Sequence, residues 1–180
     1  MLRKLFFIIT TAILVVAVFT GIVSALDVRE PLVIKTNLEN VGSFATATHV
    51  TGINYAVDNG ELYAGRPGEW RKIAPPEEVI VGAVAPDSSR PNALYVGAAN
   101  ELAVYRSTDR GQQWMRVPLT NEYVGGVTSL AFDSANQVLY VGTDTAGVFR
   151  LRDVGSSMIA GGQMPLNEAV KQVATDSTGA

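Results

Sequence analysis

The stretch STDRGQQW, residues 107–114, gathers several residue types that can do chemistry within eight positions. Ser107 could act as a nucleophile, and Asp109 could act as a base or as a metal ligand. Gly111 and Trp114 complete the spacing S-x-D-x-G-x-x-W. A catalytic loop, a metal-binding loop and a structural turn are all consistent with this cluster, so the rest of the chain must distinguish them.

A second copy of the stretch favours the structural turn. The segment AVYR precedes the first copy and GVFR precedes LRDVGSSM, residues 151–158, which aligns with it. Asp153 and Gly155 are retained in this copy, whereas Leu151 and Met158 replace the serine and the tryptophan. We would not expect a catalytic loop to recur within its own domain.

The chemistry of these residues suits a corner between two strands. The Asp109 carboxylate and the Ser107 hydroxyl can accept hydrogen bonds from backbone N–H groups of their own turn. Gly111 provides a position with positive φ that a residue with a Cβ would resist. Trp114 would then open the next strand and bury a large apolar surface against a neighbour.

These residues resemble the Asp-box of BNR repeat proteins, which include the sialidase-type and Vps10-like β-propellers. The adjoining pattern LYVGT…GVFR is similar to the photosystem II assembly-factor propellers. The resemblance covers residues 52–180. It implies a β-propeller in which the box forms the turn between the third and fourth strands of a blade, and it is far less specific for function.

The elements that would position these corners also repeat. Four apolar segments end in an Ala-x-Asp pattern that starts at Ala56, Ala85, Ala131 and Ala174, with spacings of 29, 46 and 43 residues. Periods in the forties built from short strands indicate propeller blades. After three of these segments comes a second apolar run, ELYAG, ALYVG or VLYVG.

Four strands per blade follow from these runs, because β-branched and aromatic residues dominate them and Gly, Asn, Asp and Pro separate them. The first repeat is shorter, and we expect it to lack the third strand and the box, with residues 69–73 as its fourth strand. The predicted strands of the two longer repeats are residues 81–85, 93–97, 102–106 and 114–118, then 127–132, 138–143, 147–150 and a weak strand near Met158.

The N-terminal 26 residues differ from the rest of the chain. Residues 5–26 contain no charged side chain and as a helix would be about 33 Å long, enough to cross a bilayer. Arg3 and Lys4 precede them, which predicts a cytoplasmic N-terminus and an extracytoplasmic body. The alternative is a secretory signal cleaved after small residues at 23–25. We favour an uncleaved anchor, because the apolar run is longer than usual for a signal.

The number of predicted blades is too small for a closed ring, which needs at least four. One short repeat, two long ones and a first strand at residues 170–176 can be counted. The chain could be a fragment of a longer propeller, an open array covered by partners, or one of several copies that complete a ring. Residues 27–51 would form a linker and edge strands, with strands at 31–37 and 42–50 able to cover an exposed edge.

Enzymatic and metal-binding alternatives have little support in the sequence. A sialidase-like site needs clustered arginines, and nothing places three of Arg66, Arg90, Arg106, Arg110 and Arg150 in one pocket. The loops TDTAG and FDSANQ each contain one Asp, whereas a calcium loop needs several oxygen ligands. No cysteine and only one histidine are present, and no phosphate or dinucleotide loop, so we expect no metal and no cofactor.

Charge excludes one class of partner. After residue 26 the chain has 12 Lys and Arg against 17 Asp and Glu, without a basic cluster, so nucleic-acid binding is not expected. Arg106 and Arg150 occupy equivalent positions before the two corners. We expect each to pair with a carboxylate or a carbonyl on the next blade, and partner docking is the alternative role for both.

Together these features predict a mainly β protein, a partial or truncated propeller of four-stranded blades after one transmembrane helix. The expected function is that of a non-enzymatic accessory subunit, scaffold or assembly factor of a membrane complex. Its partners would be other subunits and, through residues 5–26, the lipid bilayer. The assembly-factor resemblance suggests a respiratory or photosynthetic electron-transfer complex. The alternative is a fragment of a cell-surface carbohydrate-binding or sialidase-like glycosidase propeller.

Overall fold

The computed structural model describes residues 34–35, 37–47, 52–122, 124–166 and 168–175, and every regular element among them is a β-strand. The anchor or signal predicted at residues 1–26 lies outside this part of the chain, as does His49. Within the described residues, no helix has the length and hydrophobicity needed to cross a bilayer.

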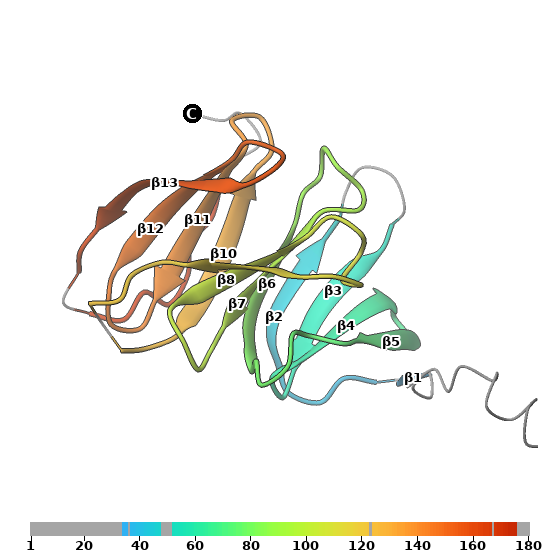
Figure 1. Ribbon diagram of the computed structural model, residues 1–180. Coiled ribbons are helices and arrows are strands. Elements are labelled where there is room, and N and C mark those ends of the chain that lie inside the picture. Colours follow the sequence, from blue (N-terminus) through green and yellow to red (C-terminus); the bar gives the residue numbers. More distant parts are fainter. Residues whose placement is uncertain (1–33, 36, 48–51, 123, 167, 176–180) are drawn as a thin grey trace, which may run out of the picture. The chain divides into compact units, whose positions relative to one another are not determined.

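Three antiparallel sheets follow one another along the chain, and we refer to them as blades 1, 2 and 3 (Figure 1). In each blade the strands are joined in sequence order, as predicted for four-stranded units. A fifth strand, β1, pairs with β5 at the outer edge of blade 1. The strands are β1 Ile34–Lys35, β2 Val41–Thr46, β3 Asn54–Asp58, β4 Glu61–Arg66 and β5 Glu69–Ile73 in blade 1, β6 Val81–Pro86, β7 Leu94–Ala98, β8 Ala103–Ser107 and β9 Met115–Pro118 in blade 2, and β10 Val127–Asp133, β11 Val138–Thr143, β12 Val148–Asp153 and β13 Met158–Met164 in blade 3.

The first strand of each blade contains the same irregularity. The register between the first and second strands shifts between Val41 and Ser43, between Val81 and Ala83, and between Val127 and Ser129. A bulge adds one residue to a strand and increases its local twist. Because the bulge recurs at one place, it gives a common frame in which positions of the three blades can be compared.

The strand assignment for the first repeat requires a correction. In this frame β2 aligns with β6 and β10, so residues 52–58 supply the second strand of blade 1, and residues 61–65 supply the third. The first strand lies in the segment 27–51, and no third strand is missing. The runs ELYAG and ALYVG are similar in sequence but occupy different strands. Residues 69–73 do form the fourth strand, as expected. The eight strands predicted for the longer repeats all correspond to observed ones, although β12 and β13 extend further.

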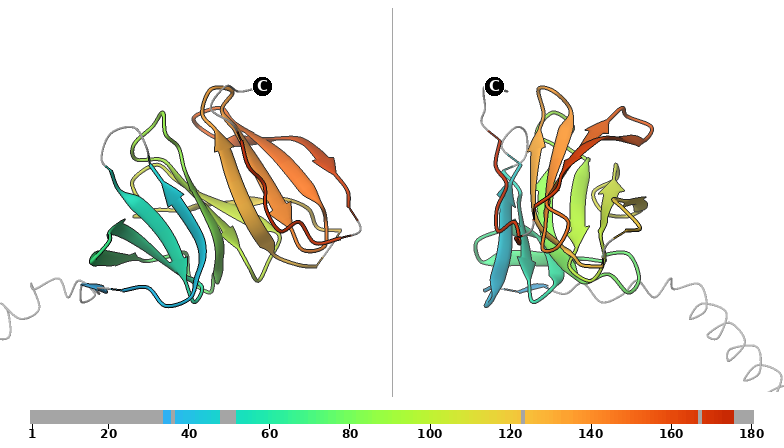
Figure 2. Two further views of the ribbon diagram at one scale, coloured as in Figure 1. Left: turned by 180° about the vertical axis from the view of Figure 1, so that it is seen from behind. Right: turned by 90° about the vertical axis from the view of Figure 1, so that its left-hand side faces the viewer.

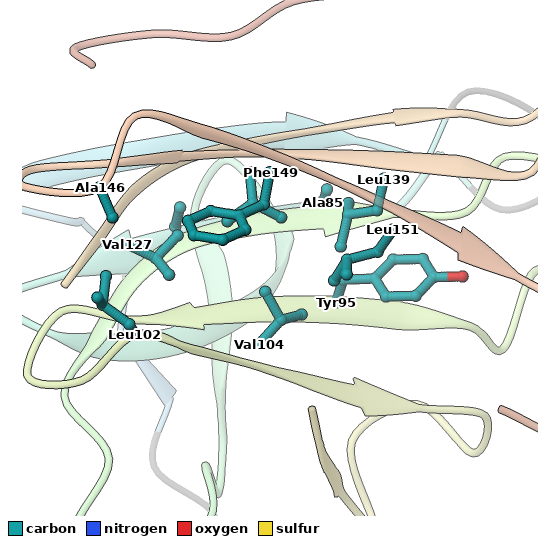
Figure 3. Close-up of a cluster of buried hydrophobic side chains, with 11 residues drawn as sticks. Ala85, Tyr95, Leu102, Val104, Val127, Leu139, Ala146, Phe149 and Leu151 are labelled. Carbon is teal, nitrogen blue, oxygen red and sulfur yellow. The ribbon is translucent and has the colours of Figure 1, made fainter. Parts of the chain in front are cut away.

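Apolar side chains fill the spaces between neighbouring blades. One cluster joins blade 1 to blade 2 and includes Tyr55, Leu62, Leu94 and Val96. A second cluster joins blade 2 to blade 3. Figure 3 shows this second cluster, in which the Tyr95 ring lies beside Leu139 and Leu151 with its hydroxyl at one end. Strands β7 and β8 are buried at every position, and their residues are apolar or glycine except for Arg106 and Ser107 at the end of β8.

Residues 168–175 return along β10, seen beside it in Figure 2. We expected a strand at residues 170–176, and the described part of this segment is not paired as a strand. It nevertheless keeps to the repeat: the Val170 amide donates to the Thr143 carbonyl oxygen (2.9 Å), and the Thr128 hydroxyl donates to the Val170 carbonyl oxygen. A Cβ on Gly142 would meet Val170, just as one on Gly97 would meet Val127. Val170 therefore stands where a first strand of a further blade would begin.

Candidate functional site

The corner at residues 107–114 connects β8 to β9 and is built from side-chain to backbone hydrogen bonds. The Ser107 hydroxyl oxygen accepts from the amides of Asp109 (3.2 Å) and Gly111 (2.8 Å). Asp109 Oδ1 accepts from the amides of Gln112 and Gln113, at 3.0 and 2.9 Å. These amides and the Ser107 hydroxyl hold the pKa of Asp109 below its ordinary value. Both polar groups are therefore occupied in shaping the chain. Membership in the Asp-box class remains a prediction.

The same corner contacts the preceding blade through neutral groups. Gly111 has φ +85°, and a Cβ there would lie 2.5 Å from Ile73 Cγ2. Glycine is therefore required both by backbone conformation and by space. Trp114 Nε1–H donates to the Ala74 carbonyl oxygen at 3.1 Å. The corner of blade 2 thus docks on the end of blade 1 through close packing at Gly111 and a neutral hydrogen bond from Trp114.

The second copy of the corner docks on its neighbour with a charge. Asp153 is buried, and its carboxylate accepts from Arg106 Nε (2.7 Å), from Arg90 Nη2 (2.8 Å) and from the Tyr95 hydroxyl. It also accepts from the amide of Gly155 at 2.7 Å. The retained aspartate therefore combines the local turn contact with an ion pair to blade 2, whereas Asp109 makes local contacts.

Electrostatics explains why a buried carboxylate is tolerated here. Burial alone would raise the pKa of Asp153, but hydrogen bonds from Arg106, Tyr95 and Arg90 outweigh it and lower the pKa well below the usual range. Burial also opposes the charge of Arg90, and its hydrogen bonds to Asp153 and Asp87 outweigh that effect and raise its pKa. Burial and the bond to Asp153 raise the pKa of Tyr95. Asp153 and Arg90 are therefore charged at neutral pH, whereas the phenol of Tyr95 is neutral.

The two arginines before the corners differ in environment. Arg106 pairs with Asp153 of the next blade, the kind of partner that we expected for it, and only 6% of its surface is exposed. Arg150 is exposed and donates to the Gly161 carbonyl oxygen at 3.2 Å. Of the two residues suggested for partner docking, Arg106 is thus enclosed between blades, and Arg150 presents its side chain on the surface.

A groove of about 850 Å³ runs along the first strands of the three blades and residues 171–175. Its size is within the range of ligand pockets. Strands β2, β6 and β10 each lie at an end of their sheet in the strand order, so one edge of each has no strand partner among the described residues. The groove is therefore bordered by backbone donors and acceptors, with small and hydroxylated side chains such as Ser43, Thr46 and Ser88.

The charged groups in this groove are few. Among the described residues that line it, Asp133 is the one carboxylate and Lys171 the one cation. Asp133 Oδ1 accepts from the amides of Ala135 and Asn136, at 2.9 and 3.0 Å, so it shapes a turn. Glycoside hydrolysis ordinarily requires two carboxyl groups about 5–10 Å apart. Nor do the described residues contain a group of three or more potential ligands that could hold a metal ion.

Sequence reasoning did not find two parts of this arrangement. It named Arg90 only as one of five scattered arginines, and it did not anticipate the groove. Arg90 follows the buried Asp87 by three residues, and its Nε donates to that carboxylate at 2.5 Å. The spacing D-x-x-R was a usable local signal, but the contact with Asp153 joins residues 63 apart in the chain.

Comparisons with solved structures place the three blades among known folds. An ancestral GH74 enzyme superposes with a TM-score of 0.58 at 18% identity, covering 77% of this chain and 22% of its own. The GH74 xyloglucanase from Xanthomonas campestris has a TM-score of 0.50 at 23% identity, covering 72% and 22%. YCF48 bound to D1 peptide has a TM-score of 0.52 at 18% identity, covering 76% and 46%.

The chain spans less than half the length of each of these structures. No protein-family model and no curated protein matches it. At these identities the likeness concerns the fold. Three consecutive antiparallel sheets, one of five strands and two of four, align with proteins of this architecture and show that the body of the chain has a β-propeller fold, with three blades described.

Proposed function

We propose that this protein is a non-enzymatic accessory subunit or assembly factor that docks an extended segment of a partner protein in the groove along β2, β6 and β10. The groove carries this proposal, because its described residues combine strand edges that lack a strand partner with small side chains and one carboxylate, which already serves a turn. An extended peptide can satisfy such edges through main-chain hydrogen bonds.

The structural neighbours are compatible with this function. YCF48 was solved with a D1 peptide bound, so a propeller of similar fold accepts a protein segment. In our proposal, residues 5–26 anchor the chain in a membrane with the propeller on the extracytoplasmic side. The partner is then a subunit of a membrane complex, and an electron-transfer complex is the host suggested by the assembly-factor resemblance.

Affinity purification of the full chain in detergent, with mass measurement of the intact complex, tests this proposal. We expect a stoichiometric partner and expect Phe44→Arg to displace it, because Phe44 lines the groove and is 57% exposed. Val124→Arg is the matched control, since Val124 is 93% exposed and is not among the residues that line the groove. Purification without a partner would overturn the accessory role. Equal retention by both variants would exclude the groove as the docking site.

A glycosidase is the second candidate, and the similarity to two GH74 enzymes is the observation that favours it. Incubation of the purified chain with xyloglucan, followed by measurement of reducing ends, tests this alternative. Release of sugar by the native chain but not by Asp133→Asn would favour the enzyme, because Asp133 is the one carboxylate among the described lining residues. We expect no release.

A further inference from the structure

The outward face of blade 3 repeats the face by which blade 2 holds blade 3. In blade 2, Ala85 pairs with Tyr95 and Tyr95 with Arg106. In blade 3, Ala131 pairs with Tyr140 and Tyr140 with Arg150. Directly paired residues of antiparallel strands point to the same face of a sheet. The row Ala–Tyr–Arg is therefore present in both blades at equivalent positions. The six residues are Ala85, Tyr95, Arg106, Ala131, Tyr140 and Arg150.

A neighbouring row strengthens the match. Gly97 pairs with Val104 in blade 2, and Gly142 pairs with Val148 in blade 3. The first strands add Ala83 in one blade and Ser129 in the other. Ser129 Oγ is buried and has no hydrogen-bond partner among the described residues. Five of these register-equivalent positions are thus identical in residue type.

This face of blade 3 points away from blade 2. The alternate residues Leu139, Val141, Phe149 and Leu151 belong to the cluster between blades 2 and 3, so Tyr140, Val148 and Arg150 lie on the opposite face. On the same face Ile159 and Met164 are 54% and 62% exposed. In blade 2 the corresponding face is covered, and its tyrosine and arginine both bind Asp153.

Blade 1 supplies the internal control for this relation. Its positions equivalent to Tyr95 and Arg106 are Tyr55 and Ala64, which pair with each other. The corner that docks on blade 1 has Asp109, and this carboxylate binds amides of its own turn. Arg106 on blade 2 is therefore matched by an aspartate of blade 3 that reaches back to it, Asp153. Ala64 on blade 1 is matched by an aspartate of blade 2 that bonds within its own turn, Asp109.

We propose that the outward face of blade 3 is a docking surface for the other three strands of a further blade of the same type, presented by a partner polypeptide, whose corner aspartate binds Arg150 and Tyr140. Residues 170–175 stand in the first-strand position of that blade. The inference deepens the proposed function by defining the chemistry of a partner: an apolar sheet with a buried aspartate between its third and fourth strands. Continuity with the interface between blades 2 and 3 and the charge of Arg150 support it.

Binding of a corner aspartate by Arg150 can be tested with an added blade of known sequence. The full chain is extended after residue 175 by a second copy of residues 133–175, so that residues 170–175 gain three further strands and a corner with a copied aspartate. We expect the added blade to fold cooperatively. Arg150→Gln should lower the folded-to-unfolded ratio of that blade by about thirtyfold or more, because the copied carboxylate becomes buried without its partner.

Arg152→Gln is the matched control, since Arg152 is an exposed arginine two residues further along β12. The position equivalent to Arg152 in blade 2 is Thr108, which takes no part in the ionic cluster. Arg152→Gln should change the folded-to-unfolded ratio of the added blade by less than about threefold. Asn in place of the copied aspartate should abolish the effect of Arg150→Gln. An added blade that stays unfolded, or equal effects of the two arginine substitutions, would overturn the docking surface.

The source of the blade is tested in the native cells with a photoreactive phenylalanine analogue in place of Ile159, which is 54% exposed on the same face. Cross-links to a second polypeptide within a strand-rich segment that contains an aspartate, reduced by Arg150→Gln but not by Arg152→Gln, are expected. Cross-links within this same chain would contradict the proposal that a partner polypeptide supplies the further blade. Loss of this cross-link with co-purification intact would reject the docking surface and leave the groove proposal standing. An added blade that folds, in a protein that co-purifies with no partner, would keep the docking surface and reject the accessory role.

Discussion

The two corners of the repeat have related sequences and dock in different ways. In blade 2 the corner contacts Ile73 and Ala74 with a glycine and an indole, and Asp109 serves its own turn. In blade 3 the corresponding aspartate, Asp153, is buried between two arginines and a tyrosine of the preceding blade. Apolar packing joins the sheets in both places, so the difference lies in the polar contacts.

The residue that decides between the two arrangements lies on the preceding blade. Where Arg106 stands, the aspartate turns toward it, and at the equivalent position of blade 1 the residue is Ala64, which cannot pair with a buried carboxylate. A buried ion pair often adds little net stability over an apolar contact, but breaking one partner is costly. The ionic corner therefore selects which sheet can follow blade 2, while the neutral corner relies on shape.

The largest expected effect comes from Asp153→Asn. The substitution keeps the shape of the side chain but leaves Arg106 buried without a carboxylate, so we expect a loss of about 3–5 kcal/mol in the free energy of unfolding. Urea unfolding followed by tryptophan fluorescence measures it. The control is Asp109→Asn at the equivalent position, for which the loss should be clearly smaller. Equal losses would mean that the two corners are energetically alike.

Acid should weaken the ionic corner selectively. The pKa of Asp153 is lower in the folded protein than the ordinary value of about 3.9 expected when unfolded. Its contribution to stability is therefore complete above about pH 5 and is lost as the pH falls below about 4 toward the folded pKa. The difference in unfolding free energy between the native chain and Asp153→Asn should be constant from pH 7 to about pH 5 and should begin to narrow between about pH 4 and pH 3. A difference that stays constant down to about pH 3 would contradict the assignment.

The neutral corner should respond least. Trp114→Phe retains an aromatic ring and removes the Nε1–H that donates to the Ala74 carbonyl oxygen. Because this contact is exposed to solvent, we expect a loss of less than about 1 kcal/mol. Fluorescence of the remaining Trp70, which is 6% exposed, reports unfolding in this variant. A loss as large as that of Asp153→Asn would show that the indole anchors blade 2.

Local pattern was sufficient for most of the fold. Strands β6 to β13 follow from alternating apolar runs and turn residues, and the pairing of Arg106 with a carboxylate on the next blade was anticipated from its place before the corner. Blade 1 was misaligned because two runs with the letters LY and G resemble each other, although Glu61–Arg66 is a third strand and Leu94–Ala98 a second. The bulge that distinguishes them is a property of pairing.

The candidate sites depended on contacts between distant residues. Asp153 was recognised as a retained corner residue, but its arginines lie 47 and 63 positions earlier, and no local spacing links them. The groove arises from the edges of three separate strands, so it has no motif of its own. The membrane anchor and the identity of the host complex remain predictions.

The bulge near the start of β2, β6 and β10 also limits where residues can be inserted into or deleted from this sequence. Beyond the bulge the side chains of β6 alternate strictly, with Val84 in the cluster shared with blade 1 and Ala85 in the cluster shared with blade 3. Removing Gly82 would convert the bulge into regular pairing and would reduce the local twist that directs β6 between its two neighbours. Evolution is therefore free to lengthen the loops of this chain, whereas single-residue gaps in its innermost strands should be selected against.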